Sequence, residues 1–90
     1  MFKTLEELIA VIRQRKKSTV EESYTKKLLN NKKLSIEKVK EEIIELIDAV
    51  EKNTNQVHEA ADVLYHLLVF LEGSGIKIED VMDELKNRKK

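Results

Sequence analysis

The sequence predicts an all-α fold, a bundle of four to five helices completed by dimerisation. The 90 residues contain no Pro and only two Gly, so little of the chain suits the turns of a β protein. Glu, Lys, Leu and Ile, which favour helices, are abundant, and apolar residues recur at steps of three and four. A core this small is marginal in a lone chain, so we expect residues 1–90 to form one domain that pairs with a second copy.

Two helices are expected in the first third of the chain. Thr4 can cap the first helix, and Glu7 stands where it would complete a capping box. The polar stretch Ser18–Glu22 is expected to link this helix to the next. Ser23 can cap a short second helix that ends near Asn30.

Three more helices are expected in the rest of the chain. The third runs from Ser35, its expected cap, to about Val50, and Lys52–Asn55 forms a turn. The fourth covers about Gln56–Glu72 and is stopped by a Gly-Ser-Gly sequence. The last helix covers Ile78 to about Arg88, with an apolar stripe along one side.

Composition and charge exclude several classes of protein. The absence of Cys excludes disulfides and thiol chemistry and fits a cytoplasmic location. We find no signal peptide and no apolar run near the ~20 residues of a membrane span. The net charge is zero and aromatic residues make up 4%, so no nucleic-acid partner is expected. The chain also lacks a Gly-rich phosphate loop, a zinc-ligand spacing and a Ser nucleophile elbow.

Two acidic clusters lie on the two central helices. Glu41, Glu42 and Glu45 belong to the third helix, and Glu59 and Asp62 belong to the fourth. Carboxylates three or four residues apart on a helix point the same way. Antiparallel helices joined by a short turn would therefore bring the two clusters opposite each other. Oxygen ligands of this kind suit Mg²⁺, or Mn²⁺, and these ions commonly bind together with phosphate groups.

The fourth helix contains polar residues where an apolar environment is expected. From Ala60 to Leu71 it is apolar in nearly every direction, so we expect it to be buried most of the way round. An unpaired carboxylate costs several kcal/mol there, so Asp62 must meet a cation, a metal or solvent in a cleft. His66 is either a hydrogen-bonded core residue or a further metal ligand. Tyr65 is either a buried aromatic residue with its hydroxyl satisfied or a ligand contact.

Charge is unevenly distributed around these helices. Between Lys26 and Lys40 there are six Lys and one acid, and between Glu41 and Glu51 there are five acids and no base. A basic segment beside an acidic one suits an anionic ligand that carries a metal. The alternative is an ordinary solvated surface of mixed charge.

Four segments resemble the phosphoribosyl-ATP pyrophosphohydrolase family, which belongs to the all-α nucleotide pyrophosphohydrolase (MazG-like) superfamily. Residues 23–25 resemble its Ser-Tyr-Thr segment, and residues 38–45 resemble its Lys-Val-Gly-Glu-Glu-x-x-Glu element. Residues 59–69 resemble its Glu-Ala-Ala-Asp-Leu-Leu-Tyr-His-Leu-Leu-Val stretch, which is the most specific part. Residues 81–88 resemble its closing Val-x-x-Glu-Leu-x-x-Arg helix. Lys40 stands where the family commonly has Gly, but no candidate ligand is lost.

The resemblance implies an activity and a set of roles. It implies Mg²⁺-dependent hydrolysis of phosphoribosyl-ATP to phosphoribosyl-AMP and pyrophosphate by a homodimer. The metal would be held by Glu42, Glu45, Glu59 and Asp62. The catalytic residues would be Glu41, Glu42 and Glu45, with Glu41 as an outer ligand or as the base for water. Phosphate oxygens would be bound by Lys38, Lys26, Lys27 and Arg88. The residues that are either structural or ligand-facing are Tyr24, Thr25, Tyr65 and His66.

Two other functions fit parts of the sequence. A house-cleaning pyrophosphohydrolase acting on dCTP, dUTP or a damaged nucleotide would share the acidic ligands and differ in its base pocket. A non-catalytic helical interaction module would keep the acids as a solvated or Lys-paired surface. The module reading explains Asp62 in an apolar helix poorly.

Overall fold

The computed structural model describes residues 2–17 and 23–89, so the expected link Ser18–Glu22 lies outside the described residues. Every regular element in those ranges is a helix, which confirms the all-α prediction. The helices are α1 (Lys3–Lys17), α2 (Tyr24–Leu29), α3 (Lys32–Lys52), α4 (Gln56–Gly73) and α5 (Ile78–Arg88).

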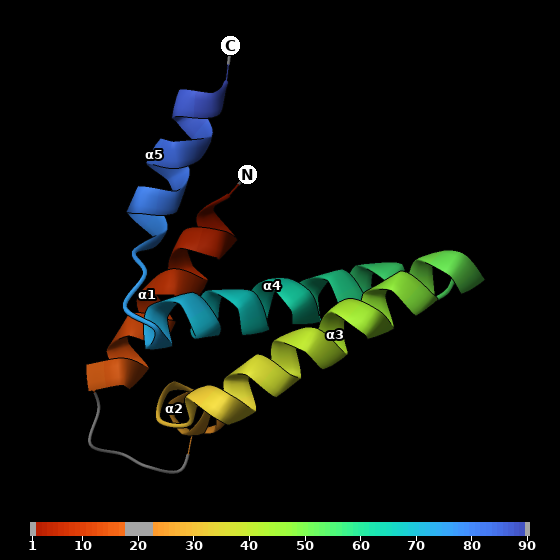
Figure 1. Cartoon of the computed structure of the whole chain (residues 1–90), viewed down its shortest axis with the longest axis horizontal. Helices are drawn as coiled ribbons and strands as arrows, with labels where there is room; N and C mark the ends of the chain where they lie inside the picture. The colour runs from red at the N-terminus through yellow and green to blue at the C-terminus, as the bar shows by residue number, and fades with distance from the viewer. Residues whose placement is uncertain (1, 18–22, 90) are drawn as a thin grey trace.

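The two longest helices, α3 and α4, lie side by side and antiparallel as a hairpin (Figure 1). The short helix α2 packs against both of them at the start of α3, and α1 packs against α2 and α4. Helix α5 follows the end of α4 and rises on the same side of the hairpin as α1 (Figure 1). One end of the hairpin is therefore covered by the other helices, and its turn end projects away from them.

The core lies at the covered end of the hairpin. Ile12 of α1, Leu28 of α2 and Val69 of α4 are the fully buried large side chains, at 0%, 1% and 0% exposure. Leu68 and Ile78 complete the buried cluster, and partly buried residues of α1, α2 and α4 surround it. Burial of these side chains supplies the main stabilisation, at about 1.5–3 kcal/mol for each large one.

Two of the expected helix caps are wrong. Helix α1 begins at Lys3, so Thr4 lies inside its first turn. Helix α3 begins earlier than expected, because the Asn31 side chain accepts a hydrogen bond from the backbone N–H of Leu34 at 3.1 Å. Ser35 consequently lies inside α3 and is buried. The expected cap of α2 is confirmed, since Ser23 accepts from a backbone N–H one turn on.

The turn between α3 and α4 depends on two asparagines. Asn53 and Asn55 have φ values of 54° and 52°, in the left-handed region that Asn tolerates better than most residues. The Asn53 N–H bonds back to the carbonyls of Ala49 and Val50, which ends α3. The side chain of Gln56 donates to the Asn53 side chain at 2.6 Å. The turn therefore sets the register in which α4 returns along α3.

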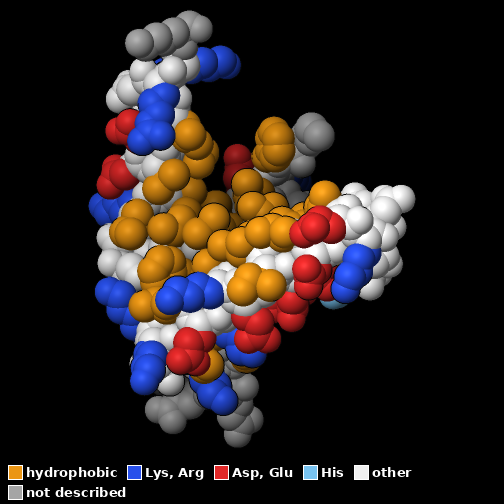
Figure 2. Space-filling model, turned by 45° about the vertical axis from the view of Figure 1, so that its right-hand side comes forward, with side chains coloured by type: hydrophobic (Ala, Val, Ile, Leu, Met, Phe, Trp, Pro, Cys, Tyr) orange, Lys and Arg blue, Asp and Glu red, His pale blue; other side chains and the backbone are white. Residues whose placement is uncertain are grey.

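The hairpin leaves an apolar face uncovered within one chain. Exposed apolar side chains gather in a band along the hairpin (Figure 2). We call this band the hairpin face; its residues are Ile43, Ile47 and Val50 of α3 and Val57, Leu64 and Leu67 of α4. Val57 is 85% exposed. The expectation that α4 is buried most of the way round is therefore not met in a single chain, because α1, α2 and α3 cover only part of it.

Candidate metal centre

The hairpin brings acidic residues of α3 and α4 together. Glu42 and Glu45 of α3 and Glu59 of α4 each place one carboxylate oxygen within 4.8 Å of the others. They converge because the helices run antiparallel through a short turn, so the residues just before the turn face the residues just after it. Three of the five residues in the two predicted acidic clusters, Glu42, Glu45 and Glu59, therefore lie together.

A second group continues the first along α4. His58, Glu59 and Asp62 also present ligand atoms within 4.8 Å of one another, so Glu59 belongs to both groups. His58 Nε2 lies 3.4 Å from Asp62 Oδ2. Sequence reasoning did not include His58 among the site residues. The signal that could have found it is its position four residues before Asp62, which places both side chains on one side of a helix.

The electrostatics of the cluster are unfavourable without a cation. Burial raises the pKa of Glu42, and the neighbouring Glu45 raises it further. Burial also raises the pKa of Glu59, and Glu45 adds to the effect while His58 opposes it. The Oε2 atoms of Glu42 and Glu59 are buried and have no hydrogen-bond partner among residues 2–17 and 23–89. Such oxygens are costly to bury unless a positive charge meets them.

The donor set fits a hard divalent cation. Its members are carboxylate oxygens from two helices, with an imidazole nitrogen at the edge. Oxygen ligands of this kind suit Mg²⁺ and Mn²⁺, and the two orphaned oxygens are free to bind an ion. The residues present could therefore hold such a metal.

Glu41 belongs to neither group of converging ligands. Its Oε2 lies 3.6 Å from Lys38 Nζ, three residues earlier on α3, and its side chain is exposed. Lys38 and Glu41 thus sit on the same helix as Glu42 and Glu45, at the border of the cluster.

Tyr24 and Thr25 of α2 bond to the part of α4 that follows Asp62. The Tyr24 hydroxyl lies 3.1 Å from His66 Nε2, and the Thr25 and Tyr65 hydroxyls are hydrogen-bonded to each other. His66 Nδ1 lies 2.9 Å from the backbone carbonyl oxygen of Asp62. His66 is buried and both its ring nitrogens have partners, so it is the hydrogen-bonded core residue of the two alternatives.

Two of the basic residues that were expected to bind phosphate, Lys26 and Arg88, make contacts away from the acidic cluster. Lys26 Nζ donates to the carbonyl oxygen of Lys16 at 3.1 Å, because α2 packs beside the end of α1. Arg88 Nε donates to Glu84 at 2.9 Å on α5, which runs away from the hairpin (Figure 1). The structure does not bring these two residues to the acidic cluster. The side chain of Lys27 is exposed on α2.

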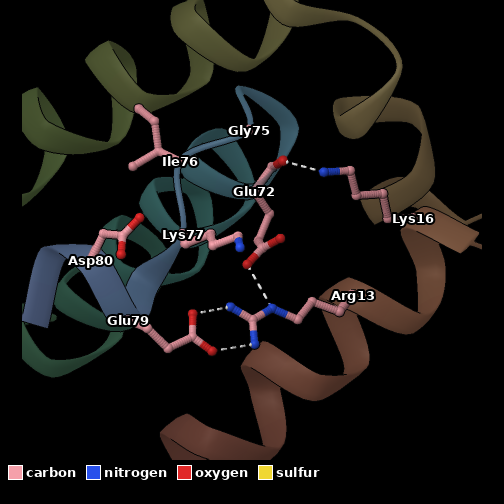
Figure 3. A pocket seen from close by; sticks show the side chains of 8 residues that line it. All are labelled: Arg13, Lys16, Glu72, Gly75, Ile76, Lys77, Glu79 and Asp80. Carbon is pink, nitrogen blue, oxygen red and sulfur yellow. Dashed lines mark hydrogen bonds and ion pairs between the residues drawn. The ribbon is translucent and has the colours of Figure 1, made fainter.

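A separate cavity of about 580 Å³ lies between α1, the end of α4 and the start of α5. Arg13 donates to Glu72 at 2.7 Å and forms a two-pronged pair with Glu79, and Lys16 donates to the Glu72 carbonyl oxygen (Figure 3). None of the site residues expected from the sequence lines this cavity. Within it, Arg13 pairs with both Glu72 and Glu79.

Fold and site together define a class: all-α proteins in which two antiparallel helices present a carboxylate cluster suited to a divalent cation. No helix in the described residues is both long and apolar enough to cross a membrane. The family model described as phosphoribosyl-ATP pyrophosphohydrolase matches residues 5–89. The chain belongs to this family, as its motifs suggested.

Curated relatives agree with the family model. The phosphoribosyl-ATP pyrophosphatase of Methylobacterium nodulans is 48% identical over 88 residues, covering 94% of this chain and 82% of the relative. That of Metallosphaera sedula is 42% identical over 93 residues, covering 100% of both chains. The histidine biosynthesis bifunctional protein of Pyrococcus furiosus is 45% identical over 87 residues, and the match covers only 41% of that longer protein.

Proposed function

We propose that this chain hydrolyses the α–β phosphoanhydride of phosphoribosyl-ATP, giving phosphoribosyl-AMP and pyrophosphate, with Mg²⁺ as the cofactor. The substrate and the reaction follow from its membership in the phosphoribosyl-ATP pyrophosphohydrolase family. The proposal of a metal rests on one observation. Carboxylate oxygens of Glu42, Glu45 and Glu59, from two helices, lie within 4.8 Å of one another. Phosphoanhydride cleavage needs phosphate charge to be neutralised and a water to be oriented, and this cluster suits both needs.

The ligands of the ion would be Glu42, Glu45, Glu59 and Asp62, with His58 beside Asp62. When bound, Mg²⁺ would supply positive charge to the phosphate oxygens; Mn²⁺ has the same preference for oxygen. The carboxylates hold their positions through α3 and α4, so the site is built on rigid elements.

Two border residues would act on water and phosphate. Glu41 lies outside the converging ligands and keeps an exposed carboxylate, so it can accept the proton of an attacking water. Lys38 Nζ lies 3.6 Å from Glu41 Oε2 and would bind a phosphate oxygen of the substrate. The proton would then reside on a Glu41 oxygen.

The two rival functions are less well supported. Family membership favours phosphoribosyl-ATP over dCTP, dUTP or a damaged nucleotide. A non-catalytic module with solvated or Lys-paired acids does not account for the buried, unpartnered oxygens of Glu42 and Glu59.

We further propose a cytoplasmic homodimer. The hairpin face is too apolar to remain in water in one chain, and a second copy offers the same face in return. A chain without Cys suits a reducing compartment.

The test is pyrophosphate release from phosphoribosyl-ATP with and without Mg²⁺. Glu59→Gln and Asp62→Asn should each lower the rate at least about 100-fold, because each removes a ligand charge. Glu51→Gln removes an exposed α3 carboxylate outside both ligand groups and should stay within about twofold of the parent. Release without any divalent ion, or equal rates in Glu59→Gln and Glu51→Gln, would refute the metal site. Faster release from dCTP or dUTP would refute the substrate.

A further inference from the structure

Aromatic side chains gather where α2 meets α4. The rings of Tyr24 and Tyr65 are nearly parallel, with centroids 6.4 Å apart and planes at 17°. The His66 ring stands edge-on to both, with centroids 5.9 Å from Tyr24 and 5.0 Å from Tyr65. The chain has only two Tyr, and both lie in this cluster.

The hydrogen bonds of the cluster have one consistent direction. The carbonyl oxygen of Asp62 can only accept, so His66 Nδ1 carries a proton and donates to it at 2.9 Å. In the neutral ring His66 Nε2 is then an acceptor, and the Tyr24 hydroxyl donates to it at 3.1 Å. Tyr24 is thereby fixed at its hydroxyl end.

Tyr24 nevertheless remains partly accessible to solvent. The residue is 48% exposed, whereas His66 beneath it is 7% exposed. The attachment of α2 to the core does not need this ring, because Leu28 is 1% exposed and Thr25 bonds to Tyr65. A large aromatic face held in one orientation and open to solvent is suited to stacking on a planar group.

The ring of Tyr24 is linked through His66 to the backbone of Asp62, the residue of α4 next to the carboxylate cluster. His66 follows Asp62 by one helical turn, and it contacts Tyr24 directly. Burial raises the pKa of Tyr24; the positive charge of Lys38 opposes this rise, and the negative charges of Glu42 and Glu41 add to it. A ligand whose phosphates meet the cluster would have its base near this ring.

We infer that the exposed face of Tyr24 stacks on the adenine ring of the substrate, and that His66 is a positioning residue that holds Tyr24 through its hydroxyl. The inference rests on the proposed function for the identity of the nucleotide. The adenine base of the substrate would contact α2, and its phosphates would contact α3 and α4.

The main test is steady-state hydrolysis of phosphoribosyl-ATP by Tyr24 variants. A stacked base is worth about 1–3 kcal/mol, so Tyr24→Leu should raise KM roughly 5- to 100-fold with a much smaller change in kcat. Tyr24→Phe keeps the ring and loses the hydroxyl bond, so its KM should rise less. Circular dichroism confirms that each variant is folded. An unchanged KM in Tyr24→Leu, or equal KM values in the Leu and Phe variants, would overturn the inference.

A double-mutant cycle tests the role of His66. His66→Leu removes the acceptor of the Tyr24 hydroxyl and should raise KM in the parent protein. In the Tyr24→Phe protein the same change should add little, because the bond is already lost. A purely structural His66 would give independent effects that multiply, and that outcome would overturn the positioning role.

Equilibrium binding separates this inference from the proposed function. AMP contains the base, and ribose 5-phosphate lacks it. Tyr24→Leu should raise the Kd for AMP roughly 5- to 100-fold and leave the Kd for ribose 5-phosphate unchanged. No AMP binding by the parent protein, or equal weakening of both ligands, would overturn the inference. If phosphoribosyl-ATP is not hydrolysed the proposed function fails, and the AMP comparison still decides whether Tyr24 contacts the base.

Discussion

Glu42 and Glu59 each keep one carboxylate oxygen out of solvent, and in the part of the chain that the structure describes neither oxygen has a hydrogen-bond partner. Burial and the nearby Glu45 raise the pKa of both residues above the value in the unfolded chain. The folded protein therefore binds more protons at these groups than the unfolded chain does. As the pH rises from their unfolded to their folded pKa values, the free energy of unfolding falls. A bound divalent cation would remove this cost, so metal and stability should be linked.

A melting series tests the linkage. In metal-free buffer near pH 7, Glu42→Gln should melt above the parent protein, because the amide removes a repelled charge. The difference should shrink as the pH falls toward about 4.3, the usual Glu value, since Glu42 then becomes neutral too. Mg²⁺ should raise the melting temperature of the parent and have less effect on Glu42→Gln. A variant that melts below the parent at every pH would contradict the prediction.

Residue spacing predicted the acidic residues that converge but not all of their neighbours. The step of three residues between Glu42 and Glu45 places both carboxylates on one side of α3, and this depends only on helical geometry. Tyr24 reaches His66 across 42 residues of sequence, and no local spacing indicates that contact.

Helix α3 and helix α4 act as one unit because a short turn fixes their register. Asn53 and Asn55 hold left-handed backbone angles in that turn, and the register places Glu45 opposite Glu59. The convergence of the acidic residues thus depends on the turn as well as on their spacing along each helix.

Substitutions at Asn55 test the turn. Asn55→Val places a β-branched residue at a φ of 52° and should lower the free energy of unfolding by about 1–2 kcal/mol. Asn55→Gly has no Cβ and should cost less at the same position. Urea unfolding measures both. A valine variant as stable as the glycine variant would show that the turn does not hold this backbone angle.

Element boundaries were predicted well where the signal was local. The range of α5 matches the expected Ile78–Arg88, and Ser23 caps α2 as expected. The cap of α3 was misplaced because Ser35 and Asn31 both suit a cap, and only the folded chain shows that Ser35 is buried.

Across the whole molecule, α5 is tied to the rest by charge. The Arg13 guanidinium of α1 contacts Glu72 at the end of α4 and Glu79 in α5, with N–O distances of 2.7 Å and 2.6 Å (Figure 3). Arg13 holds the pKa of Glu79 at about 2, below its usual range. This pair contributes stability above the usual Glu pKa of about 4.3, and the contribution is lost as the pH falls toward 2.

Hydrogen exchange tests this connection. Arg13→Gln should speed amide exchange in α5 near neutral pH, because the helix loses its charged contact with α1. Glu84→Gln is a matched control, since it removes only the exposed pair with Arg88 within α5. Equal exchange in the two variants would contradict the role of Arg13.

The hairpin face predicts the oligomeric state. Leu64→Glu introduces a charge into this apolar band and should convert a dimer to a monomer in sedimentation experiments. Lys33→Glu introduces the same side chain at an exposed position in the first turn of α3, outside the band, and should leave the dimer intact. A parent protein that sediments as a monomer would refute the homodimer.

The sequence by itself determined the all-α class, the extent of most helices and the carboxylates that share a face. These features follow from the helical repeat, which relates residues three and four positions apart. Only the tertiary structure decided that Tyr24 contacts His66, that Lys26 contacts the end of α1, and that one side of α4 is left open. Such outcomes depend on which helices pack together, and packing joins residues that no local spacing relates.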